Sequence, residues 1–140
     1  MKLLLTNAPW SNEKRLGVRA GVRWPFMLPK EEKSYPGYLP FPFMLAQATA
    51  LLKKDNFDVE FIDAIAEGLS YDDFVNKVVN IKPDIFIMET STPSFKNDIN
   101  IARIVKSRLP NVKTVFCGTH VTTFPEKTLN ENTVVDFILL

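Results

Sequence analysis

Short apolar runs alternate along the chain with segments in which apolar residues recur at helical spacing. The runs cover residues 2–6, 58–63, 84–89, 113–117 and 134–139, and each is nearly continuous in aliphatic and β-branched residues. Such runs are typical of strands that are covered on both faces, as in a parallel sheet with helices on either side. The pattern therefore predicts an α/β fold in the order β-α-β-α-β-α-β-α-β.

Sequence signals also indicate where the intervening helices begin and end. Pro42 suits the first turn of one helix, and Ser70 followed by Asp73 resembles the capping box of a second. A third helix is expected to end before Pro110, and the sequence TFPE at 123–126 predicts the cap of a short fourth helix. On the first helix the spacing predicts a broad buried face that consists of Phe43, Met44, Ala46, Ala48, Leu51 and Leu52.

Two features depart from a regular doubly wound domain. The connection from residue 8 to about residue 40 is far longer than the usual strand-to-helix loop of roughly two to six residues, which predicts a lid or a contact surface. Arg15, Arg19 and Arg23 lie four residues apart in it, but the intervening glycines argue against a helix there. The chain also ends within an apolar run, so we expect a covering helix and a further domain after residue 140.

Composition narrows the classes of protein to which the chain can belong. Its 140 residues suit one domain, and a net charge of +1 predicts no nucleic-acid partner. The single cysteine, Cys117, excludes an internal disulfide framework, a cysteine zinc site and an iron–sulfur cluster held by this chain alone, and it favours a cytoplasmic location. Residues 34–52 carry no charge, but three early prolines argue against a membrane span.

Polar and small residues gather after the predicted strands, where ligands bind in open parallel sheets. The motifs of a P-loop and of a dinucleotide-binding turn are both missing from the sequence. The residues after the first and third strands also fit a phospho-acceptor domain or a flavodoxin poorly. Small hydroxyl residues and glycine are typical of a cofactor cradle more than of an acid–base or nucleophilic site, so no catalytic residue and no metal ligand is predicted in this chain. The candidate residues are Asn7, Asp63, Ile65, Gly68, Thr90, Ser91, Thr92, Gly118, Thr119 and His120.

The whole chain resembles the N-terminal cobalamin-binding domain of B12-dependent radical S-adenosylmethionine (SAM) proteins, which include methyltransferases and the anaerobic Mg-protoporphyrin ester cyclase group. The resemblance implies a flavodoxin-like sheet of order 2-1-3-4-5, with the corrin ring over the carboxyl ends of the strands. It also implies a downstream radical SAM domain that holds S-adenosylmethionine and a 4Fe-4S cluster, because the family's three-cysteine motif is absent here. The stretches that carry the resemblance are GVRAGVRWPF, PFPFMLAQATALLKKDNFDVEFIDAIAEGLSYDDF, METSTPSFKNDI and CGTHVTTFPE.

The family's motif residues can be placed on this sequence one by one. Cobalamin domains of the methionine synthase type have Asp-x-His-x-x-Gly after the second strand, and here Asp63 and Gly68 occupy the outer positions while Ile65 replaces the histidine. The resemblance thus implies a cobalt without a histidine ligand from this motif. It also implies that Ser91 lines the pocket for the nucleotide tail and that Gly118 lets the tail pass close to the backbone.

Other interpretations of these residues remain open from the sequence alone. Asp63 could cap the turn after its strand, Thr90 to Thr92 could form a turn before a helix cap at Ser94, and His120 could be a hydrogen-bonded loop residue. The chain could also be a non-catalytic interaction domain, or a flavin or nucleotide binder, with the same fold. We expect a bulky residue at Ser91 or Gly118 to block cobalamin without unfolding the protein.

Overall fold

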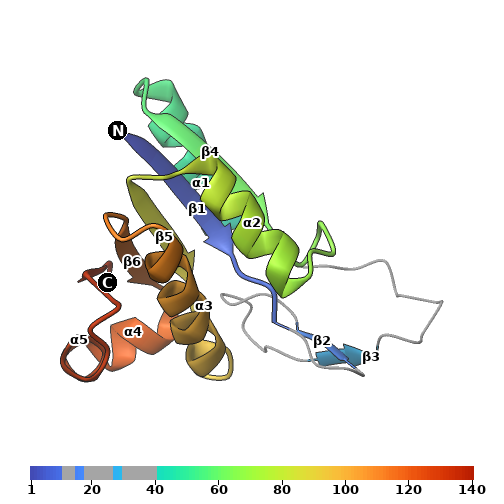
Figure 1. The fold of residues 1–140 in the computed structure, drawn as a ribbon, viewed down its shortest axis with the longest axis vertical. Coiled ribbons are helices and arrows are strands. Elements are labelled where there is room, and N and C mark those ends of the chain that lie inside the picture. The colour runs from blue at the N-terminus through green and yellow to red at the C-terminus, as the bar shows by residue number, and fades with distance from the viewer. Residues whose placement is uncertain (11–14, 18–26, 30–40) are drawn as a thin grey trace.

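The predicted five-stranded parallel sheet is present in the computed structural model, which describes residues 1–10, 15–17, 27–29 and 41–140 (Figure 1). Its strands lie in the order β4-β1-β5-β6-β7, which is 2-1-3-4-5 when only these five are counted along the chain, and all of them run parallel. The fold is therefore the doubly wound, flavodoxin-like arrangement. The strands are β1 (Lys2–Asn7), β4 (Asp58–Asp63), β5 (Ile85–Glu89), β6 (Lys113–Cys117) and β7 (Phe137–Ile138).

Helices cover both faces of the sheet, but unequally. The face that is nearer the viewer in Figure 1 carries α2 (Tyr71–Ile81) and α3 (Phe95–Arg108), whereas α1 (Phe43–Lys54) lies behind the sheet. The short helices α4 (Thr119–Thr123) and α5 (Pro125–Glu131) follow β6. Ser70 caps α2 as predicted, because its hydroxyl accepts a hydrogen bond from the Asp73 N–H at 3.1 Å.

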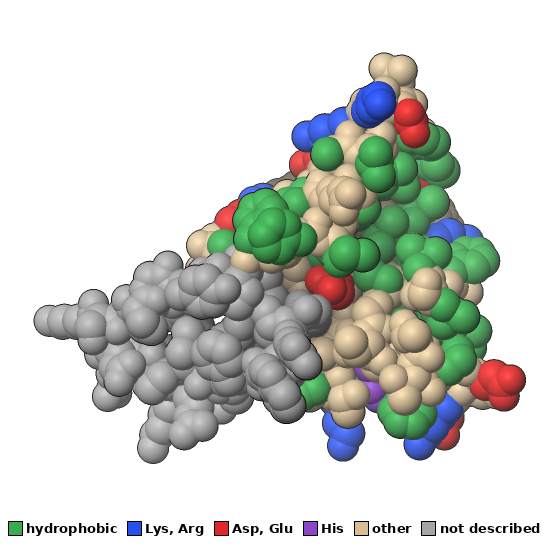
Figure 2. Space-filling model, turned by 180° about the vertical axis from the view of Figure 1, so that it is seen from behind, with side chains coloured by type: hydrophobic (Ala, Val, Ile, Leu, Met, Phe, Trp, Pro, Cys, Tyr) green, Lys and Arg blue, Asp and Glu red, His purple; other side chains and the backbone are tan. Residues whose placement is uncertain are grey.

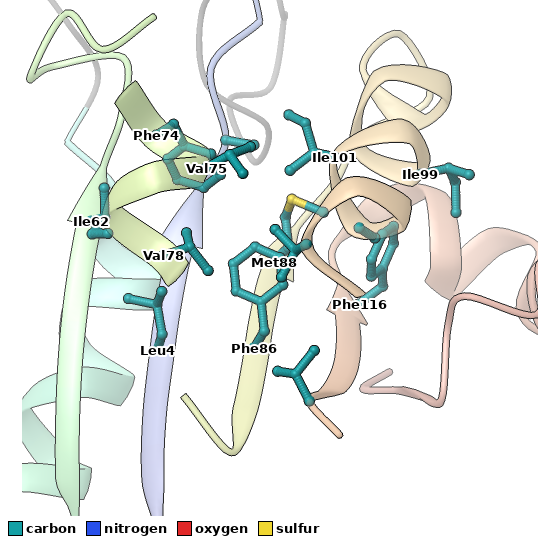
Figure 3. Packing of buried hydrophobic residues seen from close by; sticks show 14 of the residues in the cluster. Leu4, Ile62, Phe74, Val75, Val78, Phe86, Met88, Ile99, Ile101 and Phe116 are labelled. Atoms are coloured by element: carbon teal, nitrogen blue, oxygen red, sulfur yellow. The ribbon is translucent and has the colours of Figure 1, made fainter. Parts of the chain in front are cut away.

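The larger core lies between the sheet and the α2–α3 layer (Figure 3). Side chains alternate along each strand, so Leu4 of β1, Phe86 and Met88 of β5 and Phe116 of β6 all point into this core. All four side chains are fully buried. The α2–α3 face therefore has the continuous hydrophobic core that stabilises the domain.

The core on the α1 face is much smaller. Among the residues that the structure describes, its buried members are Leu3, Leu5, Leu45 and Val59. The broad buried face predicted for α1 is wrong in part, because Phe43, Met44 and Leu51 are exposed by 73%, 74% and 55%. Apolar spacing on a helix shows which side is hydrophobic, but it does not show how much of that side a neighbour covers.

The long connection and the last strand give two further findings. Within the long connection, β2 (Arg15–Gly17) and β3 (Met27–Pro29) pair antiparallel, while Arg19 and Arg23 lie outside the described residues. The last strand is only Phe137–Ile138 rather than 134–139.

The end of the chain differs from the prediction because residues 133–134 form a turn and only Phe137–Ile138 pair with β6 as a strand. Just before β7, the Asp136 carboxylate accepts a hydrogen bond from the Thr114 N–H at 2.7 Å and pairs with Lys106 at 2.6 Å. The predicted cap in TFPE is also wrong, because the Thr123 hydroxyl donates to the Thr119 carbonyl inside α4, a helix that the sequence did not predict. Pro125 begins α5 without a side-chain cap.

Candidate functional site

The order of the strands places a switch point between β1 and β5. The chain leaves β1 toward α1 on one face and leaves β5 toward α3 on the other, so the carboxyl ends of these strands border a crevice. Ligands of doubly wound sheets bind at such a place. Most of the predicted site residues lie around it, in three separate groups.

The first group borders a large apolar groove of about 860 Å³ on the α1 face. Leu3 and Leu5 of β1, Ile87 of β5 and Cys117 of β6 form its floor, and α1 forms one wall. Figure 2 views the molecule from behind and shows hydrophobic side chains gathered in a band on this face. Its remaining lining residues are Met44, Leu45, Ala48, Leu51, Leu52, Glu89, Gly118, Thr119, Thr122, Thr123, Leu139 and Leu140.

The turn from β6 into α4 borders this groove at the carboxyl edge of the sheet. Gly118 has a φ of +103°, and a Cβ added there would lie 2.4 Å from the carbonyl oxygen of Thr90. Glycine is thus required because the backbone after β5 packs against it, and the exposed residue Thr119 continues the rim. Burial, together with the negative charge of Glu89, raises the pKa of the Cys117 thiol to about 12, so the thiol is protonated and unreactive.

The second group is a buried polar cluster after β5. Thr90 and Ser94 donate hydrogen bonds to the Asp98 carboxylate at 2.6 and 2.7 Å, and Asn97 donates to it at 3.2 Å. Ser91 is 3% exposed, and its N–H donates to the Ser94 hydroxyl at 3.1 Å. Burial raises the pKa of Asp98 to about 6 although all three donors favour the charged form. Ser91 is therefore buried within this cluster and is not a lining residue of the groove.

The third group surrounds a small polar cavity at the switch point. Asn7, Ile65, Glu89 and Asp98 contribute to its lining, and its volume of about 10 Å³ is close to that of one water site. Asn7 is 1% exposed, and neither atom of its side-chain amide has a hydrogen-bond partner among the described residues. Ile65, the position of the family's histidine, therefore lies beside a polar cavity despite its own apolar side chain.

The loop after β4 holds the other two motif residues. Asp63 is nearly buried, and its carboxylate accepts a hydrogen bond from the Ala66 N–H at 3.1 Å. Gly68 has a φ of +63° with open space where a Cβ would lie. Both residues shape this turn. For Asp63 this is the turn-capping role that the sequence analysis gave as an alternative to cofactor binding.

His120 lies apart from the groove, on the other side of α4. Its imidazole stacks on Phe95 with ring centroids 3.9 Å apart, and its Nδ1 is 3.1 Å from the hydroxyl oxygen of Thr92. Burial, with a smaller contribution from Lys127, lowers the pKa of His120. Within the described residues no cluster of three or more His, Cys, Asp or Glu side chains could hold a metal ion. In the same part of the chain, no helix combines the length and the hydrophobicity that a membrane crossing requires.

Sequence reasoning missed Asp98 and the groove. The signal for Asp98 was its position four residues after Ser94, which places both on one side of a helix turn. The groove had no local signal, because Leu5, Ala48 and Ile87 resemble ordinary core residues.

Comparison with known proteins agrees with this geometry. The B12 binding domain family matches residues 36–140. The chain belongs to that family. Its relatives include an uncharacterized methyltransferase of Pyrococcus horikoshii, 31% identical over 98 residues, which are 70% of this chain and 21% of the relative. They also include the anaerobic magnesium-protoporphyrin IX monomethyl ester cyclases of Rubrivivax gelatinosus and Cereibacter sphaeroides, 31% and 28% identical over 99 residues, again 70% of this chain.

These matches confirm the family that the sequence stretches indicated, with a methyltransferase and cyclases as relatives. The B12-binding chain spans only 21%, 18% and 16% of the three relatives. The matched region includes the groove wall α1 and the polar residues after β5 and β6, but it leaves out β1, from which Leu3, Leu5 and Asn7 come.

Proposed function

We propose that this chain is the cobalamin-binding module of a radical SAM enzyme of the methyltransferase or oxidative-cyclase class. The observation that supports this most strongly is the apolar groove of about 860 Å³ that ends at the Gly118–Thr119 turn. It lies beside the switch point of a fold whose family binds B12. Its size is within the range of roughly 300–1,000 Å³ typical of small-molecule sites.

The residues present fit the two chemically different parts of cobalamin. The nucleotide tail ends in a planar aromatic base, which suits a floor made of Leu5, Ile87 and Cys117 and a wall made by α1. The corrin has an amide-rich edge, which suits the hydroxyls and backbone groups after β5 and β6. In this arrangement the corrin lies over the carboxyl ends of the strands and the tail enters the groove.

Whether this chain can provide a nitrogen ligand to the cobalt of cobalamin depends on its histidine residues. Ile65 cannot ligate cobalt, and the only histidine of the sequence, His120, stacks on Phe95 away from the groove. We therefore propose that this chain gives cobalt no histidine ligand. The bound cofactor supplies the cobalt-centred chemistry, while the chain's own residues bind it, orient it and exclude water from its tail.

The rest of the reaction belongs to a longer protein in this proposal. S-adenosylmethionine and a 4Fe-4S cluster would be held by a downstream radical SAM domain, because one cysteine cannot hold a cluster. The matched relatives are about five times as long as the aligned part, which leaves room for such a domain. The present chain would be the module that presents cobalamin to it, in the cytoplasm.

Titration of the purified chain with hydroxocobalamin, followed by absorbance, tests the proposal. We expect saturable binding and a spectrum without a nitrogen base on cobalt. A protein that is folded by circular dichroism but leaves the spectrum unchanged, and loses cobalamin on a desalting column, would instead be an interaction domain that has lost the cofactor.

A further inference from the structure

A second cavity lies on the opposite side of α4 from the groove. It has a volume of about 360 Å³ and shares no lining residue with the groove. It lies between the start of α3 and the α4–α5 pair, which are neighbours in Figure 1. Its lining residues are Phe95, Lys96, His120, Phe124, Lys127, Thr128, Glu131 and Asn132.

One side of this cavity is aromatic and uncharged. His120 lies between two phenyl rings, with ring centroids 3.9 Å from Phe95 and 5.3 Å from Phe124. Because burial and the nearby charge of Lys127 lower the pKa of His120, the imidazole is neutral at pH 7. Phe124 is 44% exposed, so this aromatic surface is open to a planar ligand.

The other side carries an excess of positive charge and an unused hydroxyl. Lys96 and Lys127 outnumber the one acidic lining residue, Glu131, and neither lysine takes part in an ion pair within the described residues. The Thr128 side chain is 1% exposed, and its hydroxyl has no hydrogen-bond partner in the same part of the chain. A buried hydroxyl without a partner is unfavourable, and a hydrogen bond to a ligand atom would remove that cost.

We propose that this cavity binds a planar aromatic anion, such as a heteroaromatic carboxylate or a nucleoside monophosphate. The ring stacks beside His120 and Phe124, the anionic group lies near Lys96 and Lys127, and Thr128 provides a hydrogen bond. The site is separate from the cobalamin groove. It does not depend on whether cobalamin binds.

His120 provides a direct test because it is the only histidine in the chain. Its imidazole C–H signals in NMR spectra report on this cavity without ambiguity. Adenosine 5′-monophosphate and indole-3-carboxylate are the two planar anions used as probes. Adenosine has the aromatic ring without the anionic group, and inorganic phosphate has the negative charge without a ring, so these two compounds are the controls. We expect both planar anions to shift the His120 signals saturably. Their dissociation constants should be at least roughly tenfold lower than those of adenosine and phosphate.

Variants separate this site from non-specific binding to positive charge. Lys127→Gln should weaken binding of the planar anions roughly tenfold. Thr128→Val should also weaken it while leaving the fold intact. Lys53→Gln, at an exposed position of α1 outside both cavities, is the matched control and should change nothing.

Three results would overturn the proposal. The first is that neither planar anion shifts the His120 signals at millimolar concentration. The second is that Lys127→Gln and Lys53→Gln weaken binding equally, which would indicate general charge attraction. The third is that hydroxocobalamin competes with the anions, which would make the cavity part of the cofactor site.

Discussion

At the residue scale, glycine is required at position 118 by the protein's own backbone. A side chain there would meet the Thr90 carbonyl and would also be forced into a φ of +103°. The sequence-based expectation of a folded but non-binding Gly118 variant is therefore not supported. The same applies to Ser91, whose bulky variant would displace the bonds around Asp98.

Gly118→Ala should therefore lower the free energy of unfolding by roughly 3 kcal/mol, because strain and collision act together. Gly68→Ala is the matched control, with a positive φ but open space around the added Cβ, and should cost only about 1 kcal/mol. Urea unfolding of both variants measures the difference. Equal losses would mean that the contact with Thr90 relaxes without cost.

Asp98 gives a prediction about pH. Its pKa is raised from 3.8 to about 6 in the folded state, so the folded protein binds this proton more tightly than the unfolded chain does. The contribution of protonated Asp98 to the free energy of unfolding is on the order of 3 kcal/mol. It is fully present below pH 3.8 and is lost as the pH rises through about 6. Asp98→Asn should remove that component of the pH dependence in urea unfolding.

Asp72→Asn, at an exposed position of α2, provides the control for this comparison. Its pH dependence between 3.8 and 6 should follow that of the original protein. If Asp98→Asn kept the original pH dependence as well, burial would not be raising the pKa of Asp98, and the cluster after β5 would be more hydrated than its geometry indicates.

At the element scale, the sequence predicted what local patterns determine. Residues 58–63 and 113–117 form strands with the expected bounds, because continuous β-branched and aliphatic runs suit a strand covered on both faces. The Ser70 cap also formed, since it depends only on residues within one turn. Exposure of Phe43 and Met44 could not be predicted, because it depends on which elements pack beside α1.

The candidate site, too, could be predicted from the sequence only in part. The residue types after each strand predicted candidate residues at the carboxyl edge of the sheet, and Asn7, Thr90 and Gly118 lie at that edge. Their separation into a groove, a buried cluster and a small cavity depends on side-chain directions across three strands. His120 belongs to another cavity because α4, which the sequence did not predict, turns its side chain toward Phe95.

The short helix α4 provides a test of the groove as the cobalamin site. Thr122 is exposed on α4 and lines the groove, so Thr122→Phe should fill part of the groove without disturbing the core. We expect cobalamin affinity to fall at least roughly tenfold, since one large side chain displaces part of the ligand. Asn130→Phe on α5 lies outside both cavities and should bind cobalamin normally in the same absorbance titration.

At the scale of the whole molecule, the two faces of the sheet differ in how completely they are covered. Among the described residues, the α2–α3 face buries three phenylalanine side chains completely, whereas the hydrophobic cluster on the α1 face has only four buried members and borders an open groove. A ligand that occupies the groove adds contacts to the less covered face alone. Binding should therefore stabilise the molecule unevenly.

Hydrogen exchange with and without hydroxocobalamin measures this unevenness. Amides of α1, at Phe43–Lys54, and of α4, at Thr119–Thr123, should exchange more slowly once cobalamin is bound, because both helices border the groove. Amides of α2, at Tyr71–Ile81, that exchange by local opening should keep their rates, because α2 packs on the opposite face. If these locally exchanging amides of α2 slowed as much as those of α1, the groove would not be the place where the tail binds.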